Sequence, residues 1–159
     1  MVSDKIYIID TSALMDGWRR HYPPDILPSL WKCLEDIIES KRLISPVEVK
    51  LELARKDDDL HEWVSRHESM FHEITDGIQS KITQIVNRFP NFVPDRSVDG
   101  IWADPYVIAL AEETGSIVIT GEKIAPENAR KLKIPNICKL LNIKSITLLD
   151  LIRREQWRF

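Results

Sequence analysis

Four acidic side chains are the residues of this chain best suited to chemistry. Asp10 ends an apolar run, Asp104 precedes an apolar helix, Glu122 follows a second apolar run, and Glu52 lies between the first two. In open α/β folds, ligands bind beyond the carboxyl ends of the strands, so these acids can converge at one edge of a sheet. Carboxylates gathered there must be protonated or bind cations, and an all-oxygen set suits Mg²⁺ or Mn²⁺.

Each acid also has a simpler interpretation. Asp10 or Ser12 could cap the helix that follows, and Asp104 could cap its own helix. Glu52 could lie on a solvated helix face, and Glu122 could lie in a surface loop. Four unrelated roles explain the joint arrangement less well than a common site does. We therefore predict a common site and keep the simpler roles as alternatives.

The first of these acids follows a predicted buried strand. The residues from Lys5 to Ile9 are mostly apolar and favour β structure. A short helix is predicted over 13–20, and Pro23-Pro24 interrupts it. The next helix opens at Asp25 or at Pro28-Ser29 and closes at Lys41-Arg42.

The segment that carries Glu52 is ambiguous. Its apolar residues alternate as in a strand from Leu43 to Leu53, but its start carries helix signals. Ser45 as N-cap, with Pro46 next and Glu48 three residues later, makes a capping box. We predict a helix. Glu48 is then assigned to the cap, although it lies one turn from Glu52 and stays a second choice for the site.

The rest of the chain alternates helices with two more apolar runs. Asp57-Asp58-Asp59 is predicted as a turn, with Asp59 and Glu62 as the capping box of a helix that carries Leu60, Trp63, Val64 and Phe71. Further helices are predicted over 78–89, 105–114, 134–141 and 148–154, and strands over 116–120 and 145–147. A helix between two apolar strands is half of a parallel α/β unit.

Bulk composition predicts one globular domain over 1–159. The chain has 159 residues, of which 43% are hydrophobic and 30% charged. It has no run of about 18 apolar residues and no basic region leading into a long apolar stretch, so we expect no membrane span, no secretory signal and a cytoplasmic location. Cys33 and Cys138 stand apart among apolar neighbours and are expected to be small buried thiols.

The charge balance does not exclude a nucleic acid as partner. The formal net charge is -3, from 22 basic and 25 acidic residues. If four acids belong to a metal site, 22 basic residues stand against 21 acidic ones, which leaves +1. The basic residues that could follow an RNA backbone are Arg19-Arg20, Arg55-Lys56, Lys123 and Arg130-Lys131-Lys133.

The ordered motifs resemble a known family. They are Ile8-Ile9-Asp10-Thr11-Ser12, Glu52-Leu53, Ala103 to Ala111 and Val118-Ile119-Thr120-Gly121-Glu122. In this order they are similar to the PIN domain, a family of metal-dependent nucleases that includes the toxin halves of many bacterial toxin–antitoxin pairs. Tyr22-Pro23 and the run Ile134 to Cys138 resemble a bacterial and archaeal branch of it.

The resemblance implies a three-layer α/β/α fold with a central parallel sheet. It places Asp10, Glu52 and Asp104 in an acidic Mg²⁺ or Mn²⁺ site, where Thr11 and Ser12 would orient Asp10 and Thr120 would also support the site. The fourth position departs from the pattern, because many members have Asp where this chain has Glu122. A longer side chain there could still reach the metal directly or through water.

The resemblance further implies an endoribonuclease that cleaves RNA with a metal-activated water. A toxin would have a protein antitoxin covering its acidic cleft, and Trp18, Trp63 and the segment Gln156 to Phe159 are candidates for a homodimer or partner surface. A PIN fold kept only to bind RNA or protein is the alternative. An aspartate-nucleophile phosphatase is disfavoured, because position 12 is Ser where such enzymes place a second Asp.

Overall fold

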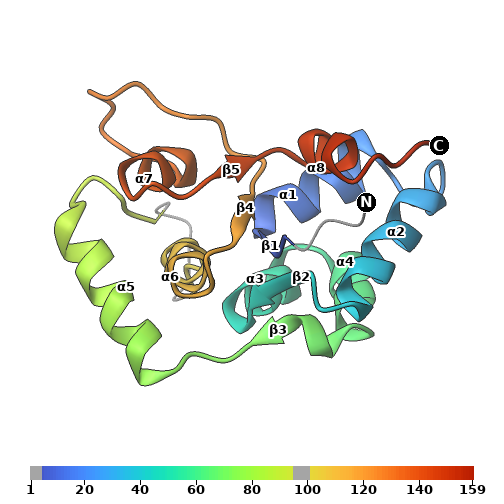
Figure 1. Cartoon of the computed structure of the whole chain (residues 1–159), viewed down its shortest axis with the longest axis horizontal. Helices are drawn as coiled ribbons and strands as arrows, with labels where there is room; N and C mark the ends of the chain where they lie inside the picture. The colour runs from blue at the N-terminus through green and yellow to red at the C-terminus, as the bar shows by residue number, and fades with distance from the viewer. Residues whose placement is uncertain (1–4, 95–100) are drawn as a thin grey trace.

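The centre of the fold is β1 (Tyr7–Ile9), the strand that precedes Asp10. The structure, a computed structural model, describes residues 5–94 and 101–159. Five parallel strands form a sheet in the order β3-β2-β1-β4-β5 (Figure 1). The other four are β2 (Leu43–Pro46), β3 (Phe71–His72), β4 (Ile117–Ile119) and β5 (Ser145–Ile146). The α/β fold class predicted from the sequence is confirmed.

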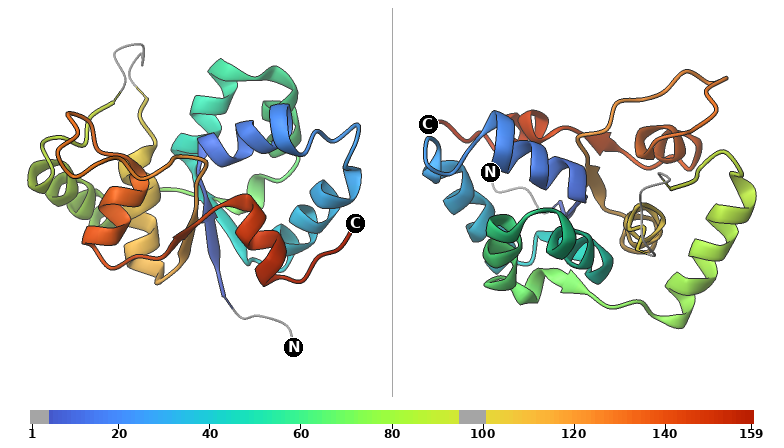
Figure 2. Two further views of the ribbon diagram at one scale, coloured as in Figure 1. Left: turned by 90° about the horizontal axis from the view of Figure 1, so that it is seen from above. Right: turned by 180° about the vertical axis from the view of Figure 1, so that it is seen from behind.

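Helices cover both faces of this sheet. The helices of the first half are α1 (Thr11–Asp16), which continues as a π-helical turn η1 (Gly17–His21), then α2 (Pro28–Glu39), α3 (Val47–Lys56) and α4 (Asp58–Ser65), followed by a 3₁₀ turn η2 (Glu68–Met70). Those of the second half are α5 (Asp76–Arg88), α6 (Asp104–Thr114), α7 (Ile134–Leu140) and α8 (Leu148–Arg154). In Figure 2, left, α5, α6 and α7 lie on one side of β1, and α2 and α8 lie on the other.

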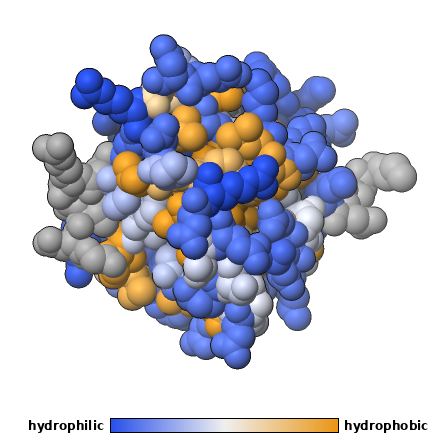
Figure 3. Space-filling view, turned by 90° about the vertical axis from the view of Figure 1, so that its left-hand side faces the viewer, coloured by the Kyte–Doolittle hydropathy of each residue, from blue (hydrophilic) through white to orange (hydrophobic). Residues whose placement is uncertain are grey.

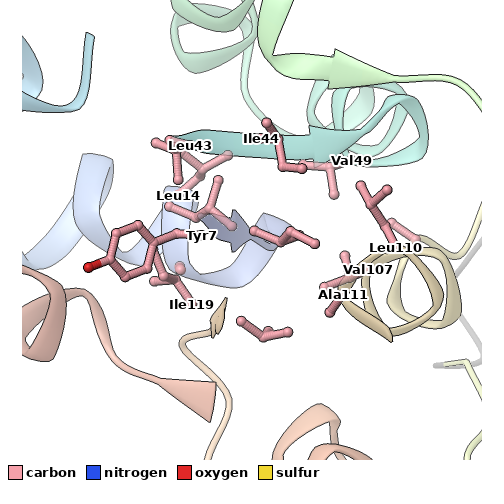
Figure 4. Packing of buried hydrophobic residues seen from close by; sticks show 14 of the residues in the cluster. Tyr7, Leu14, Leu43, Ile44, Val49, Val107, Leu110, Ala111 and Ile119 are labelled. Carbon is pink, nitrogen blue, oxygen red and sulfur yellow. The ribbon is translucent and has the colours of Figure 1, made fainter. Parts of the chain in front are cut away.

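The core forms where α6 packs on the central strands. Val107, Ile108, Ala109, Leu110 and Ala111 are all buried, because α6 contacts β1, β2 and β4 on one side and α5 on another. Figure 4 shows Val107, Leu110 and Ala111 of α6 pointing toward the strand residues. Gly115 ends the helix at φ 66°, a left-handed conformation that glycine adopts without a steric cost.

The ambiguous segment 43–53 is a strand followed by the predicted helix. Leu43 to Pro46 form β2, and α3 begins at Val47, one residue later than the predicted start at Pro46. Leu43 and Ile44 are buried and pair with Tyr7 and Ile8, so sheet pairing outweighs the local helix signals. Ser45 caps nothing. Its Oγ donates instead to the carbonyl oxygen of Ile9 at 2.8 Å, and the capping box with Glu48 does not form.

The next helix, α4, starts two residues earlier than predicted. Asp57, not Asp59, is the N-cap of α4, and its carboxylate accepts from the backbone N–H of Leu60 at 3.1 Å. Phe71, assigned to the same helix from its spacing, lies in β3. Pro28 rather than Asp25 opens α2. The helices near 78–89, 105–114, 134–141 and 148–154 and the strands near 116–120 and 145–147 are confirmed to within a few residues.

One of the two tryptophans proposed for a partner surface belongs to the core. Trp63 is 3% exposed, and its ring meets that of Trp31 edge to face with centroids 5.0 Å apart. Trp18 is half-buried and meets Trp31 in the same way at 4.8 Å. At the carboxy terminus Phe159 is exposed, whereas Trp157 packs partly against the core.

The face formed by α5 and α7 carries scattered apolar surface. Figure 3 shows apolar atoms near the middle of this face, with hydrophilic residues around them. Val86 of α5 and Leu140 of α7 are among the exposed large apolar side chains. Among the described residues, no helix is both long and apolar enough to cross a membrane.

Replacing Ser45 with Ala tests the strand assignment. Ser45 is fully buried, so the variant loses a buried hydrogen bond and leaves Ile9 with one fewer donor. We expect the free energy of unfolding to fall by about 1–2 kcal/mol in urea titrations. Ser80→Ala on the exposed face of α5 is the control and should be neutral or slightly stabilising. Equal effects of the two changes would contradict this role of Ser45.

Candidate metal centre

Three of the four predicted acids line one pocket at the carboxyl edge of the sheet. Glu52, Asp104 and Glu122 belong to the wall of a cavity of about 250 Å³, which we call the acidic pocket. Helices in parallel α/β units run against the strands, so α6 starts at the edge where β1 and β4 end. The fold thus brings together three acids that are up to 70 positions apart in the sequence, from Glu52 to Glu122.

Asp10 lies beside this pocket but is buried. It is 1% exposed, and its neighbours Thr11 and Ser12 line the pocket instead. Its Oδ1 accepts from the backbone N–H of Ala13 at 2.7 Å, so it is the N-cap of α1. The capping role and a place in the acidic cluster therefore coexist in this one residue.

Two hydroxyl groups tie Asp10 to the turn after β4. Ser12 Oγ donates to the Asp10 carboxylate at 2.8 Å and accepts from the backbone N–H of Gly121 at 2.9 Å. Thr120 Oγ1 donates to Asp10 Oδ2 at 2.5 Å and accepts from the N–H of Glu122 at 3.1 Å. Each hydroxyl therefore links one backbone N–H, of Gly121 or Glu122, to the Asp10 carboxylate. Ser12 and Thr120, both predicted to support the site, thus each bond to the Asp10 carboxylate.

Glu52 is buried on α3, which excludes a solvated helix face. It is 7% exposed, and its Oε1 accepts from Thr11 Oγ1 at 3.0 Å and from the backbone N–H of Ala103 at 3.2 Å. Thr11 therefore holds Glu52 rather than Asp10, which corrects the predicted partner. Lys56, one turn further on, places its Nζ 3.7 Å from the other Glu52 oxygen.

Asp104 is the first residue of α6 and does not cap it. Ala103 is the N-cap, and no side chain makes a cap hydrogen bond there. The pKa of Asp104 is raised to about 8, mainly by burial and then by the charges of Glu122, Asp10 and Glu52, in that order of size. A hydrogen bond with the Trp102 side chain opposes this rise in the pKa. The neighbours of Asp104 thus disfavour its carboxylate form.

Glu122 joins the pocket to the start of α7. Its Oε2 accepts from the backbone N–H of Ile134 at 3.1 Å, so the side chain is anchored and not free in a surface loop. The pKa of Asp10 is raised to about 7, because burial and, to a smaller extent, the charge of Glu122 outweigh the hydrogen bonds that lower it. Burial, followed by the charges of Asp10 and Glu122, raises the pKa of the Cys138 thiol to about 12. Cys138 is buried as predicted, whereas Cys33 is only half-buried.

The charges of neighbouring acids raise the pKa values of Asp10 and Asp104, but the four acids do not form a complete set of metal ligands. Within the described ranges, no group of three or more His, Cys, Asp or Glu side chains is placed to hold one ion together. Glu48 does not line the acidic pocket, and its Oε1 is buried without a hydrogen-bond partner among those residues. Burial raises the pKa of Glu48.

Sequence reasoning missed Asp16, which lines the same pocket. Asp16 lies one helical turn after Ser12 on α1, and this spacing could have indicated it, because residues four apart share a helix face. Lys56, Lys131 and Lys133 also line the pocket. These three belong to the basic residues named from the sequence as contacts for an RNA backbone.

The described residues thus form an α/β domain with an acidic, lysine-rimmed pocket at the carboxyl edge of a parallel sheet. A family model described as "Domain of unknown function (DUF4411)" matches residues 7–159, and the chain belongs to this family. The match includes all four acids.

Comparison with individual proteins does not indicate an activity for this chain. The crystal structure of PAE2754 from Pyrobaculum aerophilum is similar at 17% identity and a TM-score of 0.49, over 96% of this chain and 97% of that one. No curated protein matches the chain. The chemistry is therefore argued from the residues.

The raised pKa values predict how stability depends on pH. An unfolded aspartate titrates near 3.9, whereas Asp104 and Asp10 titrate near 8 and 7 in the folded chain. The folded state then holds more protons between about pH 4 and pH 8, so the free energy of unfolding falls as the pH rises through this range. In urea titrations of metal-free protein we expect a loss of about 1–3 kcal/mol between pH 6 and pH 8.

Two variants separate this effect from other titrations. Asp104→Asn removes the repelled charge and should remove much of the slope. Asp76→Asn changes the equivalent first residue of α5, which is exposed, and should keep the slope. A wild-type stability that stays constant or rises between pH 6 and pH 8 would contradict the prediction.

Proposed function

We propose that this protein is a metal-dependent endoribonuclease that hydrolyses RNA phosphodiester bonds. The observation that supports it best is the meeting of Glu52, Asp104 and Glu122 in one pocket beside buried Asp10. Like charges in a poorly solvated site raise one another's pKa, and either protons or a cation can relieve the repulsion. The resemblance of the four motifs to the PIN domain favours the cation.

The donor chemistry of the pocket fits Mg²⁺ or Mn²⁺. Asp10, Glu52, Asp104 and Glu122 offer only carboxylate oxygens, and hard divalent ions take such ligands together with several waters. The glutamates have flexible side chains that can move toward an ion, which the present arrangement requires because no three acids are yet close enough. When bound, the metal would lower the pKa of a water and neutralise charge on the phosphate.

The surrounding residues would hold the acids and attract the substrate. Ser12 and Thr120 orient Asp10, and Thr11 orients Glu52. Such outer contacts set the position and basicity of metal ligands. Lys56 and Lys133 line the pocket and place positive charge where a phosphate would approach the acids. No side-chain nucleophile is needed, and the thiol of Cys138 is protonated at neutral pH.

A non-catalytic binding module is the second candidate. One observation favours it: Glu52 is already satisfied by Thr11, Ala103 and Lys56, and Glu122 already bonds to Ile134. In that case, the acids would serve the fold, and the pocket would bind RNA or a protein without cleavage. A protein antitoxin over the acidic pocket belongs to the nuclease proposal and rests on the resemblance alone. A homodimer is proposed from the half-buried Trp18 and the exposed Phe159, and a cytoplasmic location from the apolar patterning of the sequence.

Metal binding is the first test. At a Mn²⁺ or Mg²⁺ concentration about 100 times the dissociation constant, we expect the melting temperature of the wild type to rise by about 5–10 °C. Asp10→Asn and Asp104→Asn should lose most of this rise, and Asp76→Asn should keep it, because only the first two change the acidic cluster. A wild type that melts at the same temperature with and without millimolar metal would favour the binding module.

Cleavage is the second test. With Mn²⁺, the wild type should cut single-stranded or structured RNA, and Asp104→Asn should reduce the rate by about a hundredfold or more, because loss of a residue that only supports a metal ligand already costs about 10–100-fold. The variant must keep its cooperative unfolding, which circular dichroism would check. An Asp104→Asn protein that cleaves at the wild-type rate, with Asp76→Asn as the reference, would overturn the assignment of Asp104.

A further inference from the structure

A second cavity adjoins the acidic pocket along the same sheet edge. It measures about 340 Å³, within the range of about 300–1,000 Å³ for small-molecule sites. Asp16 and Glu122 belong to the walls of both cavities. A ligand that reached from one cavity to the other would therefore pass these two carboxylates. We call the second cavity the side pocket.

The side pocket differs from the acidic pocket in chemistry. Leu148 and Leu149 of α8 line it together with Tyr22, whose ring centroid lies 6.1 Å from that of His21 in an edge-to-face arrangement. His21 also lines it. Lys123 adds a cation at the rim. Its walls thus combine aliphatic and aromatic side chains with a carboxylate of Asp16 and an ammonium group.

Two glycines let the backbone form part of these walls. A Cβ atom at Gly121 would lie 2.5 Å from Asp16 Oδ2 and 3.2 Å from the backbone of Ser12. A Cβ atom at Gly17 would lie 2.9 Å from the Leu148 side chain. Because neither position carries a side chain, the turn after β4 packs closely against α1, and η1 packs closely against α8. The side pocket is therefore built by close packing of backbone beside Asp16, whose carboxylate also lies 4.0 Å from Arg20.

We propose that the side pocket holds an unpaired nucleobase of the RNA whose phosphate lies in the acidic pocket. A base has flat apolar faces that stack on aromatic and aliphatic side chains, and a polar edge that Asp16 and Lys123 can bond. The base must be unpaired to enter, so the substrate is single-stranded at the cleavage site. The identity of the ligand as RNA rests on the proposed nuclease function, whereas the side pocket itself rests on its walls.

Nucleotide binding tests this proposal without any cleavage. Each of the four ribonucleoside 5′-monophosphates is titrated into the metal-free full chain, and amide shifts are followed by NMR. Ribose 5-phosphate is the base-free probe. We expect the nucleotides to shift the amides of Gly121, Lys123 and Leu149, and ribose 5-phosphate to leave them in place. Equal shifts from ribose 5-phosphate would mean phosphate binding and would overturn the proposal.

Two surface substitutions form a matched pair. Leu149→Trp fills the side pocket from a position that is 42% exposed, and should weaken nucleotide binding about fivefold or more. Leu140→Trp makes the same change on α7 at a position that is 56% exposed and lies outside the walls of both pockets, and should bind as the wild type does. Equal binding by the two variants would overturn the proposal.

Cleavage assays on the same pair keep the two proposals distinguishable. If no protein cleaves RNA but nucleotides still bind at Gly121 and Leu149, the nuclease proposal fails and the base site stands. If Leu149→Trp cleaves single-stranded RNA as fast as Leu140→Trp does, and nucleotides do not bind, the base site fails and the nuclease stands. Slower cleavage by Leu149→Trp alone supports both.

Discussion

The buried carboxylate of Asp10 is the constraint on which the sheet edge depends. A carboxylate with 1% exposure has lost most of its water, so protein donors must replace that solvation. The donors come from the start of α1 and, through Ser12 and Thr120, from the turn after β4. The two central strands are thereby joined at their ends by side chains in addition to their backbone ladder. The position of Glu122 follows from this arrangement, because its own N–H belongs to the same network.

Burial and repulsion act together on this group of acids. Ordinary surface carboxylates near lysines keep low pKa values, because water and counter-charges stabilise the ionised form. Here burial is the largest effect on both Asp10 and Asp104, and neighbouring acids add to it. Lys56 offsets part of the charge at Glu52, and its own side chain is 46% exposed. The surroundings therefore favour the protonated forms of Asp10 and Asp104, and such raised pKa values are common where a protein binds a cation or moves protons.

Sequence patterns predicted those features that depend on local chemistry. The apolar run before Asp10, the proline and glycine that frame α6, and the short helices of the carboxyl third all follow from side-chain type and spacing. The convergence of Asp10, Asp104 and Glu122 at one edge follows from parallel topology. What could not be predicted depends on partners distant in sequence. Ser45 carries good capping chemistry, but its segment pairs with β1, and tertiary pairing outweighs a local cap.

The bond between Glu122 and Ile134 links any bound cation to the position of α7. One carboxylate oxygen of Glu122 already accepts the first N–H of that helix, at 3.1 Å. A cation that bound both oxygens would compete with this hydrogen bond. Part of its binding free energy would then be needed to break the bond at the first turn of α7. By linkage, a change that loosens this turn would alter cation affinity, although Ile134 does not line the acidic pocket. The glutamate side chain at position 122 thus couples the acidic pocket to the start of α7.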